Sequence, residues 1–307
     1  MKLYYLSLSA NTGNNALFTL VLISCIAGLT GSAAHAQDSD RYGPWGLLDH
    51  RSRYGQYWFP EPLRADETDV DNEIRLDWVH QERTGRQFDY VKSEVEKSFG
   101  LLTLELEAPY TRESVAERTR LRAIARARAE GIGNVSIGAR HPIFQTVSND
   151  GAIDNTVGLA LEIGVPTHST VSKNTEIVPK VFDDLRLGDH FSVQFIAGNS
   201  VLLGSAPLGG VQTFEYAAVL GYALERDEIR LRGIERFIPI LEFQGETTLT
   251  HAEAGRDALS GTVGARINLD SIGPLQPRLG LGYVFPIDQG SRQDFRWGVV
   301  SSLVFEF

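Results

Sequence analysis

Acidic side chains recur at every second position in two stretches of the sequence. Glu94 and Glu96 form one pair, and Glu105 and Glu107 form another. Two carboxyl groups can act as acid and base in the hydrolysis of glycosidic bonds. Acidic residues two positions apart also share one face of any β-strand, because successive side chains point to opposite faces. The pattern therefore fits either a catalytic carboxylate pair or a charged strand face, and we favour the strand face.

The histidines do not follow a catalytic or zinc-binding spacing. Neither His-x-x-x-His nor His-Glu-x-x-His occurs in the sequence, although these spacings place two zinc ligands on one helix face. His168 precedes Ser169, and His190 lies two residues before Ser192, but no third partner for an activated serine can be named. We expect no catalytic residue, no metal site and no cofactor.

The charged pairs belong to a wider alternation of apolar and polar residues. EIRLDWVH (73–80) sets Ile74 and Trp78 against Arg75 and Asp77, and RWGVVSSLVFEF (296–307) alternates to the last residue. A period of two residues indicates a β-strand with one apolar face. Twelve segments show this pattern: 73–80, 87–97, 101–110, 131–140, 155–165, 174–182, 190–199, 213–222, 230–246, 258–269, 277–285 and 296–307.

Strand length and connections favour a membrane barrel over a secreted β-sandwich, whose strands would also alternate. Most segments have about 9–14 residues, against ~5–6 for an ordinary strand and ~9–11 for a tilted membrane strand. Short and long connections alternate, except that 141–154 is long where a short turn is expected. The fold class predicted is all-β, a transmembrane antiparallel β-barrel of about 12 strands, within a range of ~10–14.

The N-terminus has the features of a secretory signal peptide, predicted at residues 1–36. Lys2 precedes an apolar run over residues 16–29, and Ala34-His35-Ala36 offers a cleavage site. Lipidation of Cys25 within LISC (22–25) is an alternative. Cleavage would remove Lys2 and leave 28 basic against 39 acidic residues, so the formal net charge would change from −10 to about −11. Such an acidic chain is a poor nucleic-acid binder.

Residues 37–71 lack any sustained period and are rich in aromatic residues, proline and charge. We predict a periplasmic N-terminal segment that packs its aromatic residues on the barrel rim. A plug or a partner-docking tail is the alternative. The barrel itself is predicted at residues 72–307.

The polar residues at alternate positions of each predicted strand should line the barrel interior. The acids concentrate in the early strands and the arginines in the last three. Two alternatives stay open: an electric field across a constriction that orients polar solutes, and a salt-bridged network that fills the lumen. The lumen-lining residues predicted are Arg75, Asp77, Glu94, Glu96, Glu105, Glu107, Arg140, Glu162, Glu215, Glu242, Arg266, Arg278 and Arg296.

Three stretches resemble a known family. They are KSEVEKSFGLLTLELEAPY (92–110), GIGNVSIGARHPIF (131–144) and RLGDHFSVQFIAGN (186–199). They are similar to the outer-membrane barrels of the phenol meta-pathway degradation or transporter family, in scattered pieces of low specificity over residues 72–307. The resemblance implies a channel for small, often hydrophobic or aromatic, compounds. It supplies no catalytic residues, and the segment 111–130 is not part of the shared pattern.

Together these features predict a bacterial outer-membrane protein that allows passive passage of small molecules. A structural or surface-interaction barrel with a filled lumen is the alternative, and an outer-membrane hydrolase is a less favoured one. The expected partners are a small-molecule solute, outer-membrane lipid, lipopolysaccharide and the barrel-assembly machinery, with no nucleic acid. Phe305 and Phe307 form the expected assembly signal. The arginine-rich segment 111–130 is expected to be a solvated surface helix; the alternative is a basic loop that contacts lipopolysaccharide or folds over the pore mouth.

Overall fold

The computed structural model describes residues 41–42, 46–47, 59–68, 70–83, 86–115, 130–205 and 208–307. The predicted signal peptide, with Cys25, lies outside the described residues, as does most of the aromatic stretch before Phe59. The helix expected within 111–130 also falls largely outside them, at residues 116–129.

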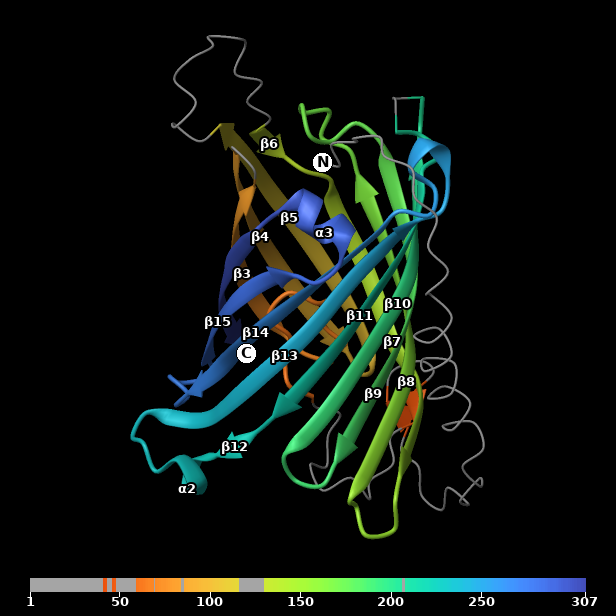
Figure 1. Ribbon diagram of the computed structural model, residues 1–307. Coiled ribbons are helices and arrows are strands. Elements are labelled where there is room, and N and C mark those ends of the chain that lie inside the picture. The colour runs from red at the N-terminus through yellow and green to blue at the C-terminus, as the bar shows by residue number, and fades with distance from the viewer. Residues whose placement is uncertain are drawn as a thin grey trace.

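In the described part of the chain, twelve long strands form a closed antiparallel barrel, which confirms the predicted fold class (Figure 1). Each predicted segment corresponds to one of these strands, and each strand pairs with its neighbours in the sequence. The strands are β3 (Glu73–Arg83), β4 (Arg86–Phe99), β5 (Leu102–Val115), β7 (Val135–Val147), β8 (Ile153–Val165), β9 (Thr175–Leu187), β10 (Phe191–Leu203), β11 (Gln212–Tyr222), β13 (Ile234–Thr248), β14 (Asp257–Leu269), β15 (Gln276–Pro286) and β16 (Trp297–Glu306).

Pairing between the last and the first long strands closes the barrel. Leu303 of β16 lies opposite Leu76 of β3, and Phe305 lies opposite Ile74. Beyond the strand, the Phe307 amide donates a hydrogen bond to the Asn72 carbonyl oxygen at 2.8 Å. Closure leaves no sheet edge whose backbone groups lack partners.

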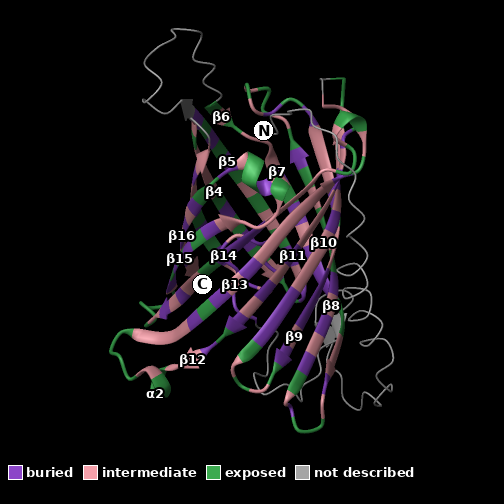
Figure 2. Ribbon diagram, in the orientation of Figure 1, coloured by how far each residue is buried: buried purple, intermediate pink, exposed green. Residues whose placement is uncertain are grey.

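Alternation along each strand separates an apolar outer face from a largely polar interior. Leu76, Leu161 and Leu281 point outward and are 47%, 44% and 63% exposed. On β3, the residues between the outward-pointing ones, such as Arg75 and Asp77, are buried inside the barrel. Buried and exposed residues therefore alternate along the ribbons (Figure 2). An outer apolar band is what a strand facing lipid requires.

Most connections at the end of the barrel where the C-terminus lies are short turns, and the longer one between β11 and β13 holds a short strand and a short helix (Figure 1). We call this the turn end and the opposite end the loop end. The prediction of a long connection at 141–154 is wrong, because β7 continues to Val147 and only residues 148–152 intervene before β8. The register shifts between Pro142 and Phe144. This bulge breaks the alternation, so the strand could not be followed through it in the sequence.

Short elements complete the described structure. Among the described residues, no helix is long and apolar enough to cross a membrane. The short strand β6 pairs with β5, β12 pairs with β13, and β1 pairs with β2. The short elements are β1 (Arg41–Tyr42), β2 (Gly46–Leu47), β6 (Glu130–Ile132), β12 (Leu224–Glu225), α2 (Arg226–Ile229), the 3₁₀ helix at His251–Glu253, and α3 (Gln289–Asp294).

Deletion of Phe307 tests the role of the aromatic C-terminus. The deletion removes the amide that bonds Asn72, and it removes the aromatic end of the closing strand. We expect less heat-modifiable barrel in outer-membrane fractions on gel electrophoresis, and Phe307→Trp should restore the yield. An unchanged yield from the deletion variant would contradict the assembly role.

Candidate functional site

The chain before β3 enters the barrel instead of lying on its rim. We call residues 59–68 and 70–72 the luminal segment. Gln194 of β10 donates to the Pro60 carbonyl oxygen at 3.0 Å, and Arg266 of β14 donates to the Glu61 carbonyl oxygen at 3.1 Å. The Leu63 amide donates to Glu242 of β13. The described part of this segment therefore lies in the lumen, where the alternative of a plug would place it, whereas most of the aromatic residues predicted to pack on the rim fall outside the described residues.

The two ends of the luminal segment both lie at the turn end of the barrel. The Phe59 ring lies 4.9 Å from the Arg186 guanidinium carbon, near the end of β9, and packs in a cluster with Leu101 of the β4–β5 turn. Asn72, at the other end, accepts the bond from Phe307. Between these ends, Asp66 reaches Lys180 of β9 at 2.6 Å. The segment thus rises into the lumen and returns.

Glycines in the barrel wall form a socket for Leu63. A Cβ atom built on Gly280 would lie 2.7 Å from one methyl carbon of Leu63, and one on Gly264 would lie 2.6 Å from the other. Leu63 itself is fully buried, and it joins a cluster that includes Val219, Ile240 and other apolar residues of the inner wall. The small wall residues therefore let the luminal segment pack against β14 and β15.

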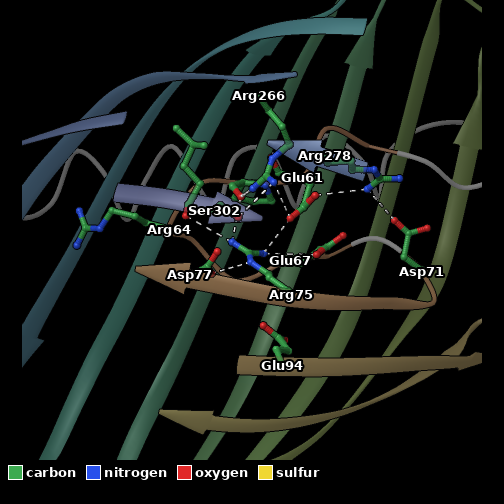
Figure 3. A network of polar contacts seen from close by, with 12 residues as sticks. Glu61, Arg64, Glu67, Asp71, Arg75, Asp77, Glu94, Arg266, Arg278 and Ser302 are labelled. Carbon is green, nitrogen blue, oxygen red and sulfur yellow. Dashed lines mark hydrogen bonds and ion pairs between the residues drawn. The ribbon is translucent and has the colours of Figure 1, made fainter. Parts of the chain in front are cut away.

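Three arginines from the wall converge on Glu61 (Figure 3). Nη1 of Arg266 lies 3.0 Å from Glu61 Oε1, and Nη1 of Arg75 lies 3.5 Å from the same oxygen. Nη1 of Arg278 lies 3.4 Å from Oε2. Arg75 also pairs with Asp77 at 2.7 Å. The ion pairs attach the luminal segment to β3, β14 and β15.

A second group of ion pairs lies on the adjoining strands β4, β5 and β7. Arg140 of β7 forms a two-pronged contact with Glu96 and lies 3.1 Å from Glu105. Lys92 lies 2.7 Å from Glu94 and 3.5 Å from Glu107. These strands therefore supply both signs of charge, and the early acids are paired with cations of the same or nearby strands.

The structure brings most of the predicted lumen-lining residues into the interior. Glu105, Glu107 and Glu162 are half-buried, and Lys180 bridges Glu162 to Asp66. Glu215 lines a cavity at the loop end. The buried members are Arg75, Asp77, Glu94, Glu96, Arg140, Glu242, Arg266 and Arg278.

Arg296 is the exception among the predicted lumen-lining residues. It is exposed and precedes β16, and its amide donates to the Glu82 carbonyl oxygen at 2.8 Å. The preceding residue, Phe295, is buried in the interior apolar cluster. The predicted segment begins at Arg296, one residue before β16 begins, so the alternation does not apply to Arg296.

Sequence reasoning missed several interior residues. Lys92 shares the parity of Glu94 and Glu96, so the alternation could have revealed it. Lys180 follows Pro179 in a weakly alternating stretch. Glu61 and Glu67 belong to the luminal segment, where no periodicity exists to place them.

A cavity of about 760 Å³, which we call the vestibule, lies between the luminal segment and the loop-end helix α3. Arg64 and Asp66 of the luminal segment contribute to its lining, and so does Asp294 of α3. Phe88 and Arg83 add an aromatic ring and a cation, with the guanidinium carbon 4.2 Å from the ring centroid. The vestibule thus offers apolar and charged surfaces together.

Helix α3 is fixed against the wall inside the loop end. Its N-cap, Asp288, accepts a hydrogen bond from the Ser291 amide at 2.8 Å, and Arg256 pairs with Asp294. A Cβ atom on Gly290 would lie 1.7 Å from the Asp257 carbonyl oxygen, so the helix can approach β14 only with glycine there. Burial raises the pKa of the Asp294 carboxyl above its ordinary value, although Arg256 opposes the shift.

The luminal segment leaves little space beside the acidic wall. A cavity of about 20 Å³ lies there, bordered by Glu67, Lys92 and Arg140. This volume has room for about one water molecule. Ion pairs thus fill the lumen around the luminal segment, as the second alternative left by the sequence describes, and the vestibule lies between the segment and the loop end.

Two of the residues considered for catalysis, His190 and Ser169, contact backbone carbonyl oxygens, and His190 Nδ1 also lies 3.7 Å from a Glu228 carboxylate oxygen. His190 Nδ1 lies 2.7 Å from the Ala223 carbonyl oxygen, and Ser169 donates to the Ile132 carbonyl oxygen at 2.6 Å. His168 has a φ of 59°, in the left-handed region. Glu105 and Glu107 are engaged by Arg140 and Lys92.

Comparison with solved structures finds outer-membrane barrels. The COG4313 outer membrane channel from Pseudomonas putida F1 is similar with a TM-score of 0.53 and 14% identity, over 81% of this chain and 100% of that chain. The NanC and KdgM porins give TM-scores of 0.44 and 0.40 at 9% and 12% identity, each over 76% of this chain and over 98% and 99% of theirs. No family model and no curated protein matches this chain. The first likeness shows a shared fold, and membership of the phenol meta-pathway family stays a prediction.

Replacement of Arg140 by methionine tests the interior pairing. The substitution leaves the buried Glu96 without its guanidinium partner, and loss of one member of a buried ion pair costs about 3 kcal/mol or more. We expect the free energy of unfolding, measured in urea for the barrel in lipid vesicles, to fall by about that amount.

Arg226→Met is the matched control for this substitution. Arg226 pairs with Asp270, and both side chains are about half exposed, so its loss should change stability by less than about 1 kcal/mol. Equal effects of the two substitutions would contradict a special role for the interior pairs.

Proposed function

We propose that the protein is an outer-membrane channel for the passive passage of small molecules, closed in this conformation by its luminal segment. The observation that carries the proposal is the vestibule of about 760 Å³, part of whose lining comes from Arg64 and Asp66 of that segment. A barrel of this strand number is wide enough to hold either side chains or a ligand. The luminal segment, which is not one of the barrel strands, thus obstructs part of the lumen.

The contacts that attach the luminal segment to the barrel wall would allow the segment to move out of the lumen. Side chains of Gln194, Glu242 and Arg266 bond its backbone, and ion pairs around Glu61 add to them. Side-chain contacts can separate without breaking the barrel strands. Movement of the segment toward the turn end would extend the vestibule through the lumen.

The vestibule is suited to small aromatic compounds that carry a charge. Phe88 and Phe295 supply apolar rings, and Arg83, Arg256 and Asp294 supply charges of both signs. Rings bury apolar area against other rings, while the charged groups can orient a polar substituent. The predicted hydrophobic or aromatic solutes are in keeping with this lining.

The proposed setting is the outer membrane of a Gram-negative bacterium. Residues 1–36 would be cleaved after export, and the turn end would face the periplasm, as short turns do in such barrels. Residues 37–71 would then approach the lumen from the periplasm. The barrel-assembly machinery would receive the C-terminal strand with Phe305 and Phe307. Lipopolysaccharide would surround the loop end, where β5 and β6 lead to the arginine-rich segment.

A structural barrel with a filled lumen is the second candidate. It is favoured by the dense ion pairs around the luminal segment and by the cavity of only about 20 Å³ beside the acidic wall. Such a barrel would act through its outer surface and would pass no solute.

Single-channel recording of Leu63→Glu tests the proposed function. The substitution replaces an apolar side chain of the inner-wall cluster with a charged one, and burial of a charge among apolar side chains is unfavourable. In planar bilayers we expect larger and more frequent salt-dependent conductance steps than in the wild-type protein. Leu63→Met, which preserves apolar character and approximate volume, should conduct like the wild type. A folded, heat-modifiable Leu63→Glu barrel that remains silent would contradict the channel and favour the structural barrel.

A further inference from the structure

Three carboxylates meet where the luminal segment joins the barrel. Glu61 and Glu67 belong to the segment, and Glu73 is the first residue of β3. One oxygen atom from each lies within 4.8 Å of those of the other two. All three residues are buried, with exposed fractions of 2%, 6% and 0%. Carboxylates gathered so closely away from water repel one another unless a cation or protons intervene.

Glu73 has no partner in this cluster. Both of its carboxylate oxygens are buried and accept no hydrogen bond, and no ion pair to it is present among the described residues. A charged group in such a position is strongly unfavourable by itself. The unpartnered Glu73 carboxylate lies close to the carboxylates of Glu61 and Glu67 and faces them.

The surrounding arginines do not balance the acids. Arg75, Arg266 and Arg278 form ion pairs with five carboxylates, and Glu73 adds a sixth, so six negative charges face three positive ones. These five carboxylates are Glu61, Glu67, Asp71, Asp77 and Glu306. Within this set of ion-paired groups the carboxylates outnumber the guanidinium groups, which favours an additional cation at the junction.

We propose that Glu61, Glu67 and Glu73 bind one calcium ion. Five of their six oxygens accept no hydrogen bond: Oε1 of Glu61 and both oxygens of Glu67 and of Glu73. Calcium takes about 6–8 oxygen ligands in flexible geometry, which mono- or bidentate carboxylates supply. Magnesium demands a more regular octahedron.

Glu61 Oε1 would be shared between the ion and Arg266, whose Nη1 lies 3.0 Å away, whereas Arg75 approaches the carboxylates less closely. Its Nη1 atom lies 3.5 Å from both Glu61 Oε1 and Glu67 Oε2, which is longer than a charge-assisted hydrogen bond of about 2.7–2.9 Å. A bound ion would join two residues of the luminal segment to the first residue of β3. It would therefore hold the segment in the lumen.

A second acidic cluster serves as an internal comparison. Glu94, Glu96 and Glu105 are similarly close together, but Lys92 lies 2.7 Å from Glu94, and Arg140 contacts the other two. Cationic side chains already occupy that cluster. The proposal is thus specific to the junction at Glu73.

Calorimetric titration with calcium chloride tests the site. The mature full-length chain, refolded into detergent without lipopolysaccharide, should bind one calcium ion per barrel with a Kd of about 1 mM or lower. Glu73→Gln should weaken binding at least tenfold. Glu176→Gln, which alters a half-buried carboxylate that accepts a bond from Ser200 on another part of the wall, should bind like the wild type.

Two results would overturn the proposal: no calcium binding by heat-modifiable wild-type barrel, or binding by Glu73→Gln with wild-type affinity. If Glu73→Gln does not fold, Glu67→Gln takes its place with the same expectation. Because the titration measures binding and not conductance, its failure would leave the channel function unaffected, and a silent channel would leave the calcium site unaffected.

Discussion

Glu61 carries a negative charge into the barrel interior, where guanidinium groups from β3, β14 and β15 converge on it. A carboxylate at this depth requires partners, because removal from water is costly. The arginines require partners as well, and without the luminal segment Arg266 would lose its ion pair with Glu61, while Arg75 and Arg278 would keep Asp77 and Glu306 of the wall. The segment and the wall therefore satisfy each other's charges. This reciprocal requirement fixes where the segment lies and which part of the lumen remains open.

Apolar packing complements the ion pairs. Leu63 fits against Gly264 and Gly280, and the same apolar cluster includes Phe295 from the loop-end connection. A segment rising from the turn end and a connection folding in from the loop end thus reach the same cluster. The vestibule is the space between this segment and this connection. Both contribute to its lining, which therefore contains aromatic rings and charged groups.

The barrel could be predicted from the sequence because one local rule governs it. Residues such as Arg75, Glu96 and Arg140 lie inside because they occupy the polar parity of long alternating strands. The rule fails where local pattern is broken, as at the Pro142 bulge. It carries no information on the luminal segment, which has no period. The Glu61–Arg266 contact joins residues 205 positions apart, and no sequence spacing indicates such a pairing.

The position of the luminal segment can be measured directly by disulfide crosslinking. In a chain with Cys25 replaced, cysteines at positions 63 and 280 would lie in the same socket, since Leu63 packs on Gly280. Mild oxidation should form a crosslink that changes mobility on a nonreducing gel. A pair at positions 63 and 273, with Gly273 in the β14–β15 turn, should stay reduced. No crosslink between 63 and 280 in a folded barrel, together with ready labelling of position 63 by a bulky water-soluble thiol reagent, would contradict a segment seated in the lumen.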